Sequence, residues 1–151
     1  MMAKLLGDKK VMQIGIVVEN IDETVQAWAL LLGVKPPSII TTEPVEEAHT
    51  QYQGRPTSAQ AKLAFFDLGQ VTLELIQPIG EPSTWKDQLV RHGSSLHHLA
   101  FEIKGMDEQI RGLAKLGVQL VQRGDYKGGR YAYLDGQKSL GAVIELLENE
   151  K

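Results

Sequence analysis

The chain has 151 residues, of which 42% are hydrophobic and 23% are charged, a composition that suits one ordinary folded domain. A net charge of -3 gives no basic surplus for nucleic acid, and no apolar run approaches the ~20 residues of a membrane span. Cysteine is absent, which excludes disulfides, cysteine–zinc sites and thiol nucleophiles. The first residues lack the apolar stretch of a signal peptide, so we expect a cytoplasmic protein.

The predicted elements follow the order β-α-β-β-β twice. In the first half, strands are expected near 11–18, 37–42, 61–67 and 71–77, with a helix near 22–32. In the second half, strands are expected near 97–103, 118–123, 130–135 and 142–148, with a helix near 106–116. A further helix near 83–92 links the halves. Residues 44–60 are polar and turn-rich, so we expect a mobile loop or a long irregular hairpin there.

A sequence repeat underlies this doubling. The stretch QIGIVVENIDETVQAWALLLGV, from Gln13, aligns with HLAFEIKGMDEQIRGLAKLGV, from His98. Asp22 and Asp107 are expected to cap the two helices at their N-termini. The repeat predicts one α+β domain over residues 1–151, in which two tandem βαβββ units, 11–77 and 97–148, are linked by 78–96. The units are expected to pack into one curved, partly closed mixed sheet.

The repeat also assigns directions to the two adjacent histidines. Neighbouring residues of a strand point to opposite faces of its sheet, so His97 and His98 should not share a face. His98 aligns with Gln13, and we expect it to face inward. His97 aligns with Met12, and we expect it to pack outside the barrel or to meet solvent.

Four polar residues occupy equivalent places in the two units. Gln13 and His98 open the first strands, whereas Glu74 and Glu145 lie within the apolar last strands. A glutamate in such a strand often lies on its solvated face, but two at equivalent positions favour a shared site. If the units pack about a pseudo-twofold axis, the four side chains converge. Their nitrogen and oxygen atoms suit a divalent metal such as zinc, cobalt, nickel or manganese.

The motifs QIGIVV, LELIQP, HHLAFEI and AVIELLE, in this order, resemble the vicinal oxygen chelate, or glyoxalase-type, superfamily. The resemblance spans nearly the whole chain and implies a glyoxalase-like fold. It also implies the metal ligands Gln13, Glu74, His98 and Glu145. Relatives commonly dimerise, so a homodimer is expected.

Two enzyme branches compete within this resemblance. WKDQLVRHGSSLHHLAFEI and KSLGAVIELLE look most like methylmalonyl-CoA epimerases, which usually have histidine where this chain has Gln13. Those enzymes also carry a second glutamate base on a strand that here reads AKLAFFD, and Lys62 is the nearest match. The ligand order Gln–Glu–His–Glu instead resembles lactoylglutathione lyase, or glyoxalase I. The arginines and asparagine that bind glutathione in that branch are replaced by Val17, Ser94 and Pro78.

Both branches begin by removing a proton beside a metal-polarised carbonyl or thioester. We expect Glu145 to be the base and Glu74 to be its partner on the opposite side. An anionic substrate group, such as a CoA phosphate, could meet Lys127, Arg130 or Lys138, although each also suits an ordinary surface position. A metal-free binding or resistance protein on the same fold is the alternative of another class, and a purely structural dimer is a third.

Overall fold

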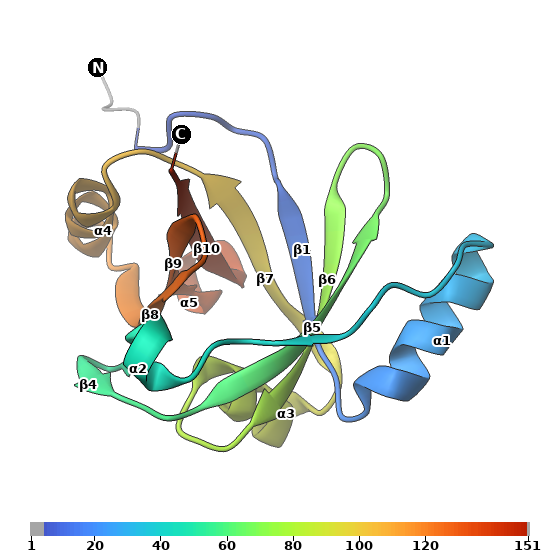
Figure 1. Cartoon of the computed structure of the whole chain (residues 1–151). Coiled ribbons are helices and arrows are strands. Elements are labelled where there is room, and N and C mark those ends of the chain that lie inside the picture. The colour runs from blue at the N-terminus through green and yellow to red at the C-terminus, as the bar shows by residue number, and fades with distance from the viewer. Residues whose placement is uncertain (1–4, 151) are drawn as a thin grey trace.

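The computed structural model describes residues 5–150, and Figure 1 shows its course. The first unit contains β1 (Gln13–Val17), α1 (Ile21–Leu32), β2 (Ile40–Thr41), β5 (Gln60–Asp67) and β6 (Thr72–Ile79). Inserted between β2 and β5 are α2 (Val45–Ala48), β3 (Gln51–Tyr52) and β4 (Arg55–Pro56). The second unit contains β7 (Ser95–Glu102), α4 (Met106–Lys115), β8 (Gln119–Tyr126), β9 (Gly129–Gly136), α5 (Gln137–Leu140) and β10 (Ala142–Asn149). The linking helix is α3 (Thr84–His92).

One curled mixed sheet joins the strands found in residues 5–150, in the order β2-β5-β6-β1-β7-β10-β9-β8-β3-β4. The first strands of the units, β1 and β7, pair antiparallel at its centre. Each of them also pairs parallel with the last strand of its own unit, β6 or β10. The order is therefore mirrored about the centre, and the predicted glyoxalase-like α+β fold is confirmed.

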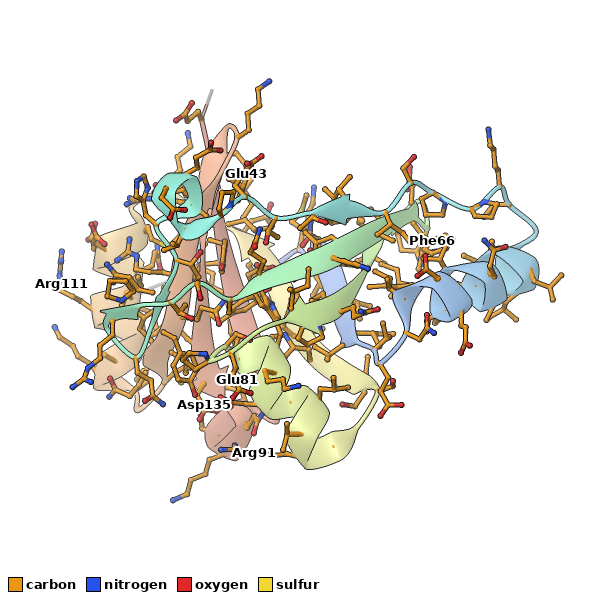
Figure 2. All side chains as sticks on the ribbon, turned by 60° about the horizontal axis from the view of Figure 1, so that its bottom comes forward. Glu43, Phe66, Glu81, Arg91, Arg111 and Asp135 are labelled. Carbon is orange, nitrogen blue, oxygen red and sulfur yellow. The ribbon has the colours of Figure 1, made fainter. Side chains whose placement is uncertain are left out.

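Two equivalent apolar clusters attach the long helices to the outer, convex face of the sheet. Figure 2 shows Phe66 on the side of the sheet that carries α1, and its cluster includes Ile21, Val25, Ala64, Leu73 and Leu75. The corresponding cluster beside α4 includes Met106, Leu113, Ala132, Leu134, Ile144 and Leu146. Burial of these side chains is the main favourable contribution to each half. Because adjacent strand residues alternate, Glu74 and Glu145 then face the concave side.

Helix α3 covers one end of the concave face, and Figure 2 shows it at the front of the molecule. Its Trp85 is 3% exposed and packs in a third cluster with residues from both units: Val17, Ala61, Ile76, Tyr133 and Val143. The side chain of Ser83 caps this helix by accepting a hydrogen bond from Lys86 N. Helix α3 therefore closes one end of the concave face and holds the two units together there.

The segment 42–57 crosses from the first unit to the second in front of the sheet (Figure 1). It leaves β2, which pairs with β5, and reaches β3, which pairs with β8. The region predicted as a loop or irregular hairpin thus contains the short helix α2 and the hairpin β3–β4. Strand β2 is shorter than predicted. Among residues 5–150, no helix is both long enough and apolar enough to cross a membrane.

The predicted aspartate caps are wrong. Asn20, the residue just before α1, caps this helix. Its side chain accepts a hydrogen bond from Glu23 N. Helix α4 follows Gly105, whose N–H donates to the Glu148 carboxylate at 2.6 Å. Asp107 instead pairs with Arg123 at 3.1 Å. Helix α4 has no side-chain cap, and its contact with a strand far along the chain leaves no local pattern in the sequence.

Candidate metal centre

Three side chains converge on the concave face: Glu74 of β6, His98 of β7 and Glu145 of β10. Nε2 of His98 lies 3.3 Å from Oε1 of Glu74 and 3.1 Å from Oε1 of Glu145. The exposed fractions of the three residues are 6%, 2% and 4% in chain order. The structure thus brings together three of the four residues that the sequence repeat placed in a common site.

The strand register explains this convergence. Glu74 lies beside Gly15 of β1, which faces His98 of β7, and Glu145 lies beside Ala100 of β7. The glutamates therefore flank the two central strands at related positions. Gly15 is needed because a Cβ atom there would overlap the ring of His98. The imidazole consequently lies directly over the backbone of β1.

A β-bulge turns both adjacent histidines toward the interior. The pairing of β1 with β7 passes from Gly15 opposite His98 to Ile16 opposite Leu96, so His97 is an extra residue in β7. His97 is 3% exposed, and its Nδ1 lies 2.8 Å from Nδ1 of His98. The prediction that His97 packs outside or meets solvent is therefore wrong. Strict alternation fails because a bulge shifts the register of side chains.

The converging atoms are buried without hydrogen-bond partners. Among residues 5–150, few side-chain atoms are buried in this way, and they include Oε1 of Glu74, Nε2 of His98 and Oε1 of Glu145. Buried polar atoms are normally satisfied, and carboxylates are especially costly to leave unpaired. The ligand atoms of the three residues lie within 4.8 Å of one another. A cation held among them would satisfy all three, and this donor set fits a divalent metal.

The electrostatics of the metal-free cluster reflect this crowding. Burial by itself lowers the pKa of His98. The close approach of the Glu145 and Glu74 carboxylates outweighs burial and raises that pKa to about 10. Burial, assisted by the charge of Glu145, raises the pKa of Glu74. Burial and the neighbouring His98 hold the pKa of His97 well below 6.5. In the absence of metal, a proton on His98 therefore partly compensates the two carboxylates.

Gln13 lies beside this cluster on the neighbouring strand. It is two residues from Gly15, so both side-chain positions share the concave face of β1, and it sits opposite Ala100. The residue is partly buried. The sequence repeat predicts that its amide oxygen is a fourth metal ligand. Strand register thus puts Gln13 on the same face as the cluster, and its ligand role stays a prediction.

Aromatic and polar side chains that were not predicted from the sequence to belong to the site surround the cluster. Tyr133 lies opposite Glu145, and its hydroxyl accepts a 3.1 Å hydrogen bond from Trp85 Nε1. Burial, assisted by the charge of Glu145, raises the pKa of Tyr133 well above 10. Tyr131 accepts a 3.0 Å bond from Gln122. The alternation in YAY could have indicated that both tyrosines face inward.

Lys62, the nearest match to the second base, and the three predicted contacts with an anionic substrate group lie away from the cluster. Lys62 pairs with Gln77 and shares the α1 side of the sheet, the face opposite Glu74. Arg130 forms an ion pair with Glu148, with the closest atoms 2.6 Å apart. Lys127 and Lys138 are exposed, the first in the β8–β9 turn and the second on α5. The structure thus brings none of the four to the cluster.

Comparison with known proteins identifies the family. Residues 12–133 match the Glyoxalase/Bleomycin resistance protein/Dioxygenase superfamily. The chain belongs to this superfamily. Its members include enzymes and non-enzymes, and they often bind a divalent metal. The buried Glu74–His98–Glu145 cluster is therefore a residue group that could hold such a metal in this member of the superfamily.

Individual relatives give further context. The chain is 30% identical over 138 residues to the uncharacterised protein YqjC of Bacillus subtilis, covering 89% of each. A hypothetical protein from Bacillus halodurans superimposes with a TM-score of 0.65 at 21% identity, covering 94% of this chain and 95% of the other. Methylmalonyl-CoA epimerase from Mycobacterium tuberculosis gives a TM-score of 0.64 at 20% identity, covering 100% and 94%. These two likenesses support the glyoxalase-like fold.

Proposed function

We propose that this protein is a metal-dependent enzyme that removes a proton from the carbon next to a carbonyl, acting most like a methylmalonyl-CoA epimerase. The observation that carries the proposal is the buried Glu74–His98–Glu145 cluster, whose three converging atoms have no hydrogen-bond partner among residues 5–150. Gln13 would add an amide oxygen as a fourth ligand. Zinc, cobalt, nickel and manganese all suit this donor set.

The bound cation would polarise the substrate carbonyl and stabilise the negative charge that follows proton loss. Glu145 is the base in this proposal and takes the proton from the neighbouring carbon onto its carboxylate. Glu74, two strands beyond His98 across the sheet, delivers a proton from the other side. Removal on one face and return on the other inverts the carbon.

The substrate class rests on two observations of different weight. Solved structures with this fold include a Streptomyces coelicolor methylmalonyl-CoA epimerase in complex with 2-nitronate-propionyl-CoA, with a TM-score of 0.62 at 20% identity, covering 94% of this chain and 98% of that one. This likeness supports a CoA thioester. The amide of Gln13 favours lactoylglutathione lyase as the second candidate. Against it, Val17 is fully buried and the Ser94 hydroxyl accepts from Glu19 N, so neither position offers a cation for glutathione.

Solvent deuterium exchange tests the reaction. Metal-loaded protein is incubated in deuterium oxide with methylmalonyl-CoA, and the glutathione–methylglyoxal adduct is run beside it. We expect deuterium at the carbon between the two carbonyl groups of methylmalonyl-CoA. The Glu145→Gln variant should lower exchange by about 100- to 10,000-fold, as for removal of a general base. The exposed Glu150→Gln variant is the matched control and should exchange at the wild-type rate.

The same experiment separates the alternatives. Deuterium exchange at the wild-type rate in Glu145→Gln would show that Glu145 is not the base. Turnover of the glutathione adduct alone would favour the lyase. Binding of methylmalonyl-CoA by metal-loaded wild type, with no deuterium incorporated from either substrate, would favour a binding protein on the same fold.

A further inference from the structure

His97 is a buried ring for which the proposed reaction has no use. The bulge in β7 places it beside His98, with 2.8 Å between the two Nδ1 atoms. Its other nitrogen, Nε2, lies 3.1 Å from Oγ1 of Thr84, the first residue of α3. Both nitrogens of His97 therefore have a polar partner in the interior. A side chain that only filled space would not need two directed contacts.

These contacts determine which nitrogens carry protons once His98 binds a metal. Nε2 of His98 points at both glutamates, so metal binding there requires that the ring proton sit on Nδ1. That proton must then be donated to Nδ1 of His97, which accepts. His97 therefore carries its own proton on Nε2, from which it donates to the Thr84 hydroxyl. No other arrangement of protons satisfies both contacts and leaves Nε2 of His98 free.

We propose that His97 is a positioning residue that holds His98 in the tautomer and orientation whose Nε2 lone pair binds the metal. The inference rests on the metal site of the proposed function, but it does not depend on the substrate or the reaction. Partners of this kind, which hydrogen-bond to the far nitrogen of a ligating histidine, commonly affect metal affinity as well as ring orientation. Here the partner is itself a histidine, placed by a β-bulge.

Helix α3 completes the arrangement. Thr84 N donates to Oε1 of Gln122 at 2.8 Å, which ties the start of the helix to β8. The ring of His97 also packs against Tyr133, with centroids 5.0 Å apart. The orientation of His98 is therefore fixed in series, first by His97, then by Thr84, and finally by the attachment of α3 to β8.

Two substitutions of similar size at position 97 test the proposal. Asparagine can present an amide oxygen near the place of Nδ1, whereas leucine offers no acceptor, and both lose the contact with Thr84. We expect His97→Leu to raise the dissociation constant for Co²⁺, measured by calorimetry, about 10- to 100-fold. His97→Asn should restore most of that loss. Thermal unfolding of both metal-free proteins checks that each variant is folded.

A second pair of variants keeps the test decisive if His97→Leu fails to fold. Thr84→Val removes the hydroxyl but retains the backbone bond to Gln122, and Thr84→Ser retains both. We expect Thr84→Val to weaken Co²⁺ binding about fivefold, the value of one hydrogen bond, and Thr84→Ser to bind as the wild type does.

Nitrogen-15 NMR of zinc-loaded protein gives a readout that a packing role would not change. In the wild type and His97→Asn, His98 should bind zinc through Nε2 and show a hydrogen-bonded proton on Nδ1. That proton should lose its protection in His97→Leu. Co²⁺ affinity and a protected proton that are both unchanged in His97→Leu would overturn the proposal, as would a proton on Nε2 of zinc-bound His98. A wild type that binds no metal would overturn this inference and the metal site together, whereas metal binding without deuterium exchange would count against the proposed reaction alone.

Discussion

The two halves of the concave face share one backbone plan but carry different side chains. Strand register makes Gln13 the counterpart of His98 and Gly15 the counterpart of Ala100. Glu74 faces Phe65 across its strand pair, just as Glu145 faces Tyr133. The glutamates are thus retained in both halves, whereas their neighbours differ. The second half supplies an imidazole and a hydrogen-bonded tyrosine, and the first supplies an amide and a phenylalanine.

The difference extends to the residues just before Gln13 and His98. Met12 precedes Gln13 and is 41% exposed, whereas His97 precedes His98 and is 3% exposed. The bulge in β7 accounts for the buried position of His97. The duplicated backbone therefore places two equivalent carboxylates, whereas the local change of register in β7 gives the second half a buried histidine that the first half lacks.

The largest expected effect comes from filling the space over Gly15. The Gly15→Ala variant puts a methyl group into the volume of the His98 ring, which must move away from the glutamates. We expect unfolding free energy to fall by about 1–3 kcal/mol from overpacking. Metal affinity should fall at least about 10-fold, because the nitrogen ligand is displaced. Chemical denaturation and metal titration measure the two effects.

The control for this steric effect is Gly7→Ala, whose added methyl group would meet no atom within 4 Å. It should change neither stability nor metal affinity. If Gly15→Ala binds metal as tightly as the wild type, the ring of His98 is not the group that sets affinity.

An intermediate effect concerns pH and metal removal. In the metal-free protein the pKa of His98 is raised from 6.5 to about 10, so its stabilising contribution is complete below about pH 6.5 and is lost as pH rises toward 10. The raised pKa of Glu74 acts in the same direction. Metal binding requires a deprotonated His98, so it strengthens over the same range. The difference in Tm between metal-loaded and metal-free protein should therefore grow from pH 6.5 upward. A constant difference would contradict the cluster as the metal site.

The smallest expected effect sharpens the contrast between Tyr133 and Phe65. Tyr133→Phe gives the second half the side chain that the first half already has, and it leaves Trp85 Nε1 without its acceptor. We expect unfolding free energy to fall by about 1–3 kcal/mol, the value for a buried unpaired donor, with little change in metal affinity. Denaturant titration of metal-loaded and metal-free protein separates the effect on stability from the effect on metal affinity. A large loss of metal affinity would mean that Tyr133 helps to hold the cluster.

The sequence predicted the fold because the repeat constrains it twice. Equivalent apolar positions in the two helices and in the last two strands of each unit lead to the same two clusters, and Glu74, Glu145 and His98 follow from the repeat. His97 could not be predicted in the same way. Its direction depends on a bulge created by pairing with β1, and pairing between distant strands leaves no local pattern.

The place of Lys62 and the pairing of the β3–β4 hairpin also depend on contacts between strands. Lys62 was chosen for its place along a motif, but it pairs with Gln77 on the α1 side of the sheet. The hairpin β3–β4 could be anticipated as a hairpin, but its pairing with β8 of the other unit could not. The ligand role of Gln13, the limits of the two units, a homodimer and a cytoplasmic location stay predictions.

Anomalous diffraction from crystals soaked in Co²⁺ tests the central claim most directly. The account predicts one peak per chain on the concave face, about 2.0–2.2 Å from Nε2 of His98 and from carboxylate oxygens of Glu74 and Glu145. The amide oxygen of Gln13 should complete the protein ligands at a similar distance. A crystal that shows no peak there, or shows the ion bound only to surface carboxylates, would contradict the account.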